Sequence, residues 1–263
     1  MDVVHSTLMS KTQVKTRSDG RADNQMRPVQ IHMGYQDAGE GSVLIEQGRT
    51  RVLCTASVEH SQPPHLKGTD RGWVTAEYGM LPRAALGVRA PRESVTGHRK
   101  GRTYEIERMI GRALRSVTDL KSIGPRTIHV DCDVLQADGG TRTASIIGGF
   151  MALGQAVQRG MEAGQFKRMP LSAYVAAVSV GIVQSAGLAR RPCMDLTFEE
   201  DSKALVDMNV VWTSEGRLAE IDAAGEGCSF GEPELSDLLA LSKSGADTLF
   251  DLERSLLALD FPG

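Results

Sequence analysis

DCDVLQADGGTRTASI, residues 131–146, is the stretch of this sequence that says most about the fold. Its first part alternates, with Cys132 and Val134 on one side and Asp131 and Asp133 on the other, which is the period of a half-buried strand. Two glycines follow, and residues 141–163 are then rich in Ala, Gly and Ile. The stretch therefore predicts a strand, a glycine turn and a helix that is buried on several sides.

A helix that begins directly after glycines can bind an anion. The first backbone N–H groups of a helix have no partner within it, and its dipole favours negative charge there. Gly139 and Gly140 would let a phosphate approach the backbone, Thr141 adds a hydroxyl, and Arg142 adds a planar fork suited to phosphate oxygens. The alternative is an ordinary helix start capped by Asp138. The spacing is not that of a Walker A loop.

Working outward, short apolar runs separated by turn residues predict further strands, and longer periodic runs predict helices. The strands are expected at residues 29–33, 42–46, 51–58, 73–80, 126–136, 174–183, 192–198, 207–213 and 217–223. A further helix is expected at 103–120, and one or two helices at 232–257. Residues 82–100 contain prolines, glycines and arginines without apolar periodicity, so a long loop is expected there.

Strands followed by helices, twice, predict an α+β chain with two halves, in which helices pack on mixed sheets. We place the joint at Arg168-Met169-Pro170, giving a first half of residues 17–168 and a second half of 169–263. Residues 1–16 lack a signal-peptide core and are expected to form a flexible extension, with a short targeting role as the alternative.

Charge is unevenly distributed. The net charge is −3, which argues against a general nucleic-acid-binding protein. Residues 83–115 nevertheless hold nine Arg or Lys against three Glu, whereas Glu199, Glu200 and Asp201 form an acidic run. This asymmetry suits an enzyme that holds a polyanion in one place and a metal in another, and a solvated basic helix is the alternative.

Other features limit the class of protein. No run of about 18 apolar residues occurs, so no membrane span is expected. The four cysteines share no CxxC spacing, which argues against a zinc site and favours free thiols in a reducing cytosol.

A second candidate site contains Asp201 and Asp207. The connection between them is short enough to bring both carboxylates to one edge of a sheet. Mg²⁺ takes one or two carboxylates and completes its shell with water and phosphate oxygens. A polar hairpin loop is the alternative. Arg102, at the start of the first predicted helix, is either a phosphate ligand or solvated.

These same segments resemble the RNase PH family. The resemblance covers about residues 17–257 and rests on Arg17-Ser-Asp-Gly-Arg21, Gln25-Met-Arg27-Pro28-Val29, Gly41-Ser-Val-Leu-Ile-Glu46, Gly72-Trp-Val-Thr-Ala-Glu-Tyr-Gly-Met-Leu-Pro-Arg83, Gly101-Arg-Thr103, Ile110-Gly-Arg-Ala-Leu-Arg115, residues 131–146, Glu199-Glu-Asp-Ser-Lys-Ala204 and Asp207-Met-Asn-Val-Val211.

The resemblance implies a duplicated RNase PH fold, related to a ribosomal-protein domain, and a cytoplasmic phosphate-dependent 3′-to-5′ exoribonuclease. It implies trimming of tRNA precursors and other RNA 3′ ends, release of nucleoside 5′-diphosphates, reversal as a nucleotidyltransferase, and a homo-hexamer built as a trimer of dimers. It further implies that inorganic phosphate is the co-substrate, bound by Arg102, Gly140, Thr141 and Arg142. By the same resemblance, Mg²⁺ (or Mn²⁺) would be bound by Asp201 and Asp207, and RNA by the loop arginines Arg83, Arg89, Arg92 and Arg99.

The alternative within the resemblance is a catalytically inactive, ring-forming RNA-binding subunit. Such a subunit should lack the paired Asp or the phosphate-binding Arg, and this chain has both. The chain departs from the family in the less basic loop after Arg83. It also has Glu220-Ile-Asp-Ala-Ala-Gly-Glu-Gly227 in place of a Glu-Val-Gln-Gly-Thr-Ala-Glu-Gly pattern.

Overall fold

The computed structural model of the chain describes residues 17–85, 87, 89–92, 97, 101–184 and 189–262. The expected N-terminal extension lies outside the described residues, as does Arg99 of the candidate RNA-binding loop.

The first half contains a five-stranded sheet with the order β1-β2-β3-β5-β4. Strands β1, β2, β3 and β5 are antiparallel neighbours, and β4 runs parallel to β5. The strands are β1 (Val29–Met33), β2 (Gly41–Gln47), β3 (Thr50–Glu59), β4 (Trp73–Met80) and β5 (Thr127–Gln136). The helices are the 3-10 turn η1 (Pro64–Leu66), α2 (Gly101–Arg115), α3 (Leu120–Ile123) and α4 (Thr141–Glu162).

The second half contains a four-stranded antiparallel sheet with the order β7-β6-β8-β9. Its strands are β6 (Val175–Val183), β7 (Arg191–Met194), β8 (Val206–Thr213) and β9 (Leu218–Gly225). Its helices are the short α5 (Phe198–Asp201) and the long C-terminal α6 (Glu232–Leu256).

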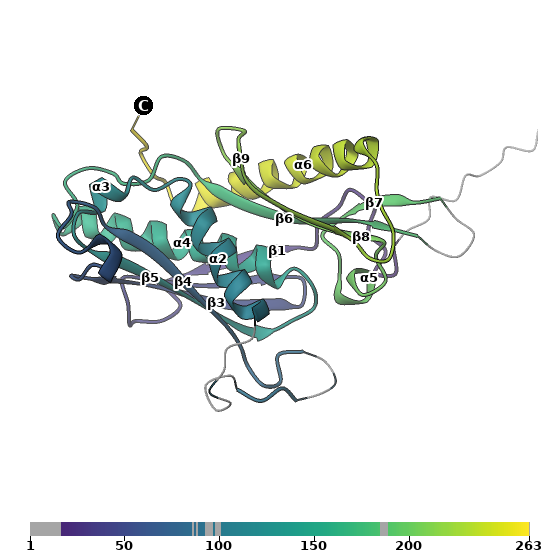
Figure 1. Cartoon of the computed structure of the whole chain (residues 1–263), viewed down its shortest axis with the longest axis horizontal. Helices are drawn as coiled ribbons and strands as arrows, with labels where there is room; N and C mark the ends of the chain where they lie inside the picture. The colour runs from purple at the N-terminus through teal and green to yellow at the C-terminus, as the bar shows by residue number, and fades with distance from the viewer. Residues whose placement is uncertain are drawn as a thin grey trace, which may run out of the picture.

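The elements stack in layers, as Figure 1 shows: the first sheet, helices α2 and α4, the second sheet, and α6. Helix α4 contacts β2 and β3 on one side and β6 on the other, which explains why most of it is buried. Its small residues allow this close packing, since a Cβ on Gly148 would lie 2.7 Å from the sulfur of Cys54. One hydrophobic core therefore joins the two halves.

Two predicted elements were wrong in extent. The first predicted helix, 103–120, is the shorter α2, because Asp119 starts a new helix by capping α3. The predicted strand 192–198 ends at Met194, because Asp195 has a φ of 53° and Thr197 then forms a capping box with Glu200 at the start of α5. Asp201 therefore ends a short helix instead of lying at a strand exit.

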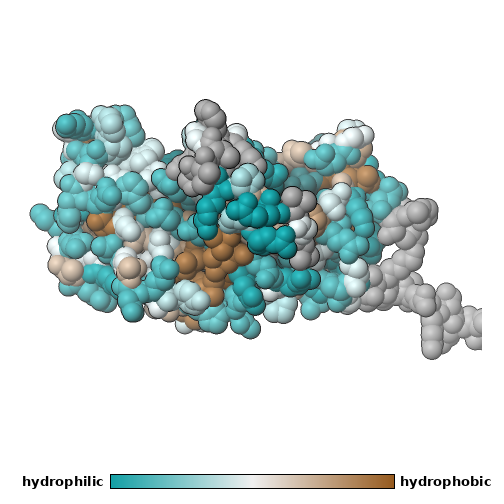
Figure 2. Space-filling view, turned by 90° about the horizontal axis from the view of Figure 1, so that it is seen from below, coloured by the Kyte–Doolittle hydropathy of each residue, from teal (hydrophilic) through white to brown (hydrophobic). Residues whose placement is uncertain are grey.

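Figure 2 shows the face below the first sheet as mostly hydrophilic, with an apolar patch near its middle. Among the residues that the structure describes, no helix has the length and apolar character needed to cross a bilayer.

Candidate active site

A cavity of about 1250 Å³ lies between the two halves, and residues from both line it. The first half contributes the end of β4, the start of α2 and the glycine turn before α4. The second half contributes α5 and the strands β6, β8 and β9. The structure thus brings together all the predicted phosphate and metal residues, which are Arg102, Gly140, Thr141, Arg142, Asp201 and Asp207.

The start of α4 opens into this cavity. Gly140 is its N-cap residue, with a φ of 68°, and no side chain caps it, so the alternative of an Asp138 cap is not formed. Gly139 has a φ of 81°, and a Cβ there would lie 2.4 Å from the carbonyl oxygen of Leu196. Both positions therefore require glycine, and the first-turn N–H groups are left without a capping side chain.

A buried ion pair holds the glycine turn in place. The guanidinium of Arg27 donates to the carbonyl oxygens of Asp138, at 2.5 Å, and Gly139, at 3.4 Å. The same group pairs with Asp195 at 2.5 Å, and the Asp195 side chain is only 1% exposed. Asp195 also accepts from the Arg27 backbone N–H, at 2.7 Å, and from the Gln47 amide, at 2.9 Å. Asp195 follows β7, so this pair ties the second half to the turn before α4.

Two more arginines extend this network towards α5. Arg17 donates to Glu200 at 2.6 Å and to the Asp195 carbonyl oxygen at 2.9 Å, while Arg21 donates to the same carbonyl at 3.1 Å. Burial opposes ionisation of Glu200, but its hydrogen bonds with Arg17 and Thr197 lower its pKa overall. Glu200, part of the acidic run in the sequence, is therefore occupied in holding α5.

The sequence alone assigned no role to this network. Arg17, Arg21 and Arg27 were noted only as motif residues, and Asp195 was included in a predicted strand. Three arginines within eleven residues, ahead of the first strand, are the signal that could have pointed to buried acidic partners.

Asp201 and Asp207 lie on the opposite wall. Asp201 is the last residue of α5, and Asp207 is the second residue of β8, paired in register with Gly181 and Ala224. Burial, followed by the nearby charge of Asp201, raises the pKa of Asp207 to about 6. Burial also raises the pKa of Asp201. The two carboxylates therefore interact, and the arginines facing them oppose the shift.

The carboxylate oxygens of Asp201 and Asp207 suit a hard divalent cation that takes its remaining ligands from water or phosphate oxygens. Within the described ranges, neither carboxylate has a hydrogen-bond or ion-pair partner, and no three His, Cys, Asp or Glu side chains cluster as a complete metal cage. Mg²⁺ usually keeps several waters and binds one or two carboxylates together with phosphate oxygens. Asp201 and Asp207 match that requirement, and Mn²⁺ accepts the same oxygen donors.

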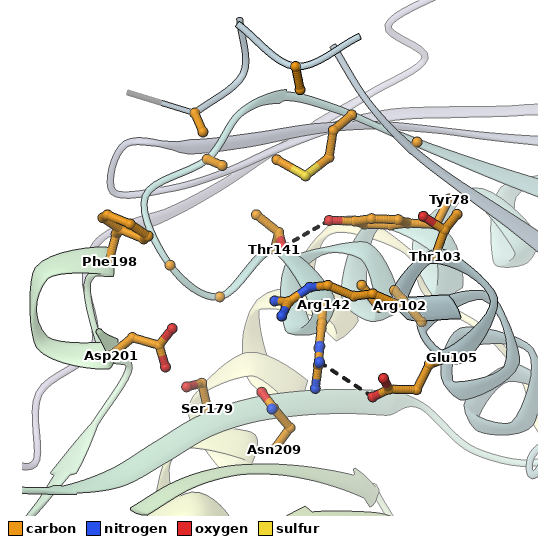
Figure 3. Close-up of a pocket in the computed structure, with 18 of the residues that line it drawn as sticks. Tyr78, Arg102, Thr103, Glu105, Thr141, Arg142, Ser179, Phe198, Asp201 and Asn209 are labelled. Carbon is orange, nitrogen blue, oxygen red and sulfur yellow. Dashed lines mark hydrogen bonds and ion pairs between the residues drawn. The ribbon is translucent and has the colours of Figure 1, made fainter. Parts of the chain in front are cut away.

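Arg102 and Arg142 reach into the cavity between Thr141 and Asn209 (Figure 3). Arg102 lies in the first turn of α2. The two terminal nitrogens of Arg142 face carboxylates, Asp222 at 2.9 Å and Glu105 at 3.4 Å. The sequence did not single out either acidic partner.

Thr141 is oriented by a residue that the sequence also missed. The hydroxyl of Tyr78 donates to Thr141 Oγ1 at 3.0 Å (Figure 3). Burial raises the pKa of Tyr78, so this phenol stays protonated and able to donate. The Thr141 hydroxyl hydrogen is then free to point towards an anion.

The candidate RNA-binding arginines that the structure describes, Arg83, Arg89 and Arg92, are all exposed. Arg92 also lines the cavity, and Arg83 donates to the carbonyl oxygen of Gly87 at 2.7 Å.

Comparison with known proteins matches both halves of the chain to one family. Residues 25–157 match the 3′ exoribonuclease family, domain 1, and residues 173–245 match domain 2 of the same family. The chain is 48% identical over 246 residues to Ribonuclease PH of Bacillus subtilis (strain 168), covering 94% of this chain and 98% of that protein. It is 47% identical over 246 residues to Ribonuclease PH of Bacillus velezensis, with the same coverage.

Solved structures agree on the fold. Rice (Oryza sativa) Rrp46 matches with a TM-score of 0.73 and 20% identity, covering 92% of this chain and 100% of that one. A chain of the archaeal exosome core matches with a TM-score of 0.71 and 21% identity, covering 91% of each. The duplicated RNase PH fold predicted from the sequence is confirmed, and the chain belongs to the 3′ exoribonuclease family, as an RNase PH member.

Proposed function

We propose that this chain is a phosphorolytic exoribonuclease that trims the 3′ ends of tRNA precursors and releases nucleoside 5′-diphosphates. One observation carries the proposal: an uncapped helix start with two arginines faces a pair of half-buried carboxylates across a single cavity. The family membership and the near-full-length kinship to two proteins named Ribonuclease PH support the same activity.

Each wall has its own role in this proposal. Arg102, Arg142, the Thr141 hydroxyl and the N–H groups at the start of α4 hold inorganic phosphate. Asp201 and Asp207 hold Mg²⁺ (or Mn²⁺), which supplies positive charge beside the scissile phosphodiester when bound. The negatively charged RNA end and the phosphate can thus approach each other despite their repulsion.

The reaction needs no protein nucleophile. A phosphate oxygen attacks the phosphorus of the last internucleotide bond, the bond from phosphorus to the 3′ oxygen breaks, and that oxygen takes a proton to become the new 3′ hydroxyl. The arginines hold the attacking phosphate in line, so positioning and electrostatics provide the catalysis. Because the diphosphate product keeps a phosphoanhydride bond, the reverse reaction adds nucleotides.

The test is to incubate the protein with a 3′-extended tRNA and Mg²⁺, with and without inorganic phosphate, and to identify the released nucleotide. We expect nucleoside 5′-diphosphate, formed only with phosphate. Monophosphate formed equally in phosphate-free buffer would identify a hydrolase. RNA binding without shortening under any condition would favour the inactive, ring-forming subunit.

We also propose that the chain acts in the cytoplasm as a homo-hexamer, a trimer of dimers, with Arg83, Arg89, Arg92 and Arg99 gripping RNA. The physical reason is that one chain offers only a local basic cluster on a net acidic body, and a ring multiplies the phosphate contacts. Light scattering of the active protein tests this arrangement, and an active monomer would contradict it.

A further inference from the structure

Arg142 is already engaged by acidic side chains in the cavity. One terminal nitrogen of its guanidinium donates to Asp222 at 2.9 Å, and the other lies 3.4 Å from Glu105. Its Nε is buried and has no hydrogen-bond partner among the described residues. A guanidinium binds phosphate best through two parallel N–H bonds, so carboxylates at both terminal nitrogens of Arg142 compete for the donors that a phosphate would use there.

Asp222 is the stronger of these two competitors. Its contact with Arg142 is the shorter, and its side chain is 43% exposed, somewhat less than that of Glu105. Glu105 is more than half exposed, and a solvated pair of that kind contributes little.

The surrounding strands fix the position of Asp222. It lies on β9 opposite Asn209 of β8, and both residues line the cavity. Strand β9 is tied to α2 by a second ion pair, in which Arg112 donates to Glu220 at 3.0 Å. Asp222 is therefore held beside the site by the sheet, and its charge also acts to raise the pKa of Asp207.

We propose that Asp222 is a positioning residue that competes with inorganic phosphate for Arg142 and so raises the phosphate concentration at which the enzyme works. The inference rests on the proposed function, because it takes Arg142 to be a phosphate ligand. Binding of phosphate to the terminal nitrogens of Arg142 weakens the Asp222–Arg142 pair and places two anions near each other.

The experiment compares the phosphate KM and kcat of the full-length wild type with those of Asp222→Asn and Asp222→Gln. A short RNA and saturating Mg²⁺ are used, and phosphate binding is measured by calorimetry without RNA. Removing the competing carboxylate should lower the phosphate KM and Kd by about fivefold, as expected for losing one partly exposed ion pair, and change kcat by less than about twofold.

Two comparisons separate this role from a general charge effect. Glu226 lines the same cavity, and in the part of the chain that the structure describes no hydrogen bond or ion pair joins it to Arg142. Glu226→Gln therefore removes equal charge and should change the phosphate KM by less than about twofold. In an Arg142→Lys background, which retains the charge but loses the fork, Asp222→Asn should have a smaller effect than in the wild type.

An unchanged or higher phosphate KM in both Asp222 variants would overturn the inference. So would an unchanged phosphate KM with a raised Mg²⁺ requirement, which would assign Asp222 to the metal. Both results leave the proposed function intact if the wild type still releases nucleoside diphosphate. If the wild type shortens RNA without phosphate, the proposed function itself fails.

Discussion

The two walls of the cavity are built in opposite ways. The phosphate wall contains the start of α4, Arg102 and Arg142. Behind it, Arg27 and Asp195 form a buried, hydrogen-bonded pair that fixes the glycine turn before α4. On the acidic wall, Asp201 and Asp207 are partly buried but have no partner among the described residues. The phosphate wall is thus preorganised for an anion. The acidic wall leaves its carboxylate oxygens available for a metal ion.

This difference has an energetic consequence. A buried carboxylate with arginine partners is stabilised where it lies, but removing one member leaves an uncompensated charge. A buried carboxylate without a partner destabilises the fold when ionised, as the raised pKa of Asp207 indicates. Mutations in the Arg27–Asp195 pair should therefore mainly lower the stability of the fold, whereas mutations of Asp201 or Asp207 should mainly lower activity.

The largest expected effect is on the acidic wall. Asp201→Asn or Asp207→Asn should lower turnover roughly a thousandfold or more, because the metal charge near the scissile phosphorus is lost. Single-turnover phosphorolysis of a short RNA at saturating phosphate measures the loss. The matched control is Asp237→Asn, an exposed carboxylate on α6. Near-normal turnover in both site variants would place the metal elsewhere.

The second prediction concerns the phosphate wall. Asp195→Asn should lower the free energy of unfolding by about 3 kcal/mol, since it removes the charge that compensates Arg27 in the interior. Denaturant unfolding measures the change. Asp19→Asn is the control, because Asp19 pairs with Arg21 at 2.7 Å but its side chain is 34% exposed, so its loss should cost less than about 1 kcal/mol. Equal costs for the two variants would refute the contrast.

The third prediction uses pH. Asp207 has a pKa of about 6 and must be ionised to hold a metal, so turnover should fall as the pH drops through about 6. At the acid limit the fall approaches about tenfold per pH unit. Raising the Mg²⁺ concentration should move this acid limb to lower pH, because the metal competes with the proton. If the pH of this acid limb does not change with the Mg²⁺ concentration, the titrating group is not Asp207.

The effect of Asp207 on stability should have the opposite pH dependence: turnover rises with pH, whereas the free energy of unfolding falls. The folded-state pKa of Asp207 is above its ordinary value of 3.8, so the folded state holds the proton more tightly and this contribution to stability is lost as the pH rises towards 6. At pH 7.5, Asp207→Asn should therefore raise the free energy of unfolding, by about 2 kcal/mol. Denaturant unfolding at pH 5 and pH 7.5 checks whether the gain grows with pH.

The strand and helix pattern was readable from the sequence because it depends on local periodicity. Residues 131–146 predicted β5, the glycine turn and the start of α4, and the described structure has them there. Asp201 and Asp207 both line one cavity, and their proximity was predictable because only five residues of chain lie between them.

What the sequence did not predict are contacts between distant segments. Arg27 and Asp195 are 168 residues apart, and Arg142 and Asp222 are 80 residues apart. No periodicity connects such pairs, because they meet only when the second sheet packs onto α4. The end of the strand at Met194 was missed for a different reason: the capping box of Thr197 and Glu200 outweighs the apolar run before it.

The smallest effect on catalysis is expected from the loop beside the cavity. Replacing Arg89, Arg92 and Arg99 together by Ala should weaken tRNA binding and flatten its dependence on salt, because fewer phosphates are neutralised per complex. With aromatic residues at only 5% of the chain, base stacking has few side chains to compensate for the loss. Phosphorolysis of a very short RNA needs only the two walls, so its kcat should change by less than about threefold.

Titrations of tRNA binding against salt, paired with assays on the short RNA, separate substrate capture from chemistry. A triple variant that trims tRNA normally at physiological salt would show that the grip comes from other residues, and an equal loss on both substrates would show that the loop shapes the phosphate wall itself.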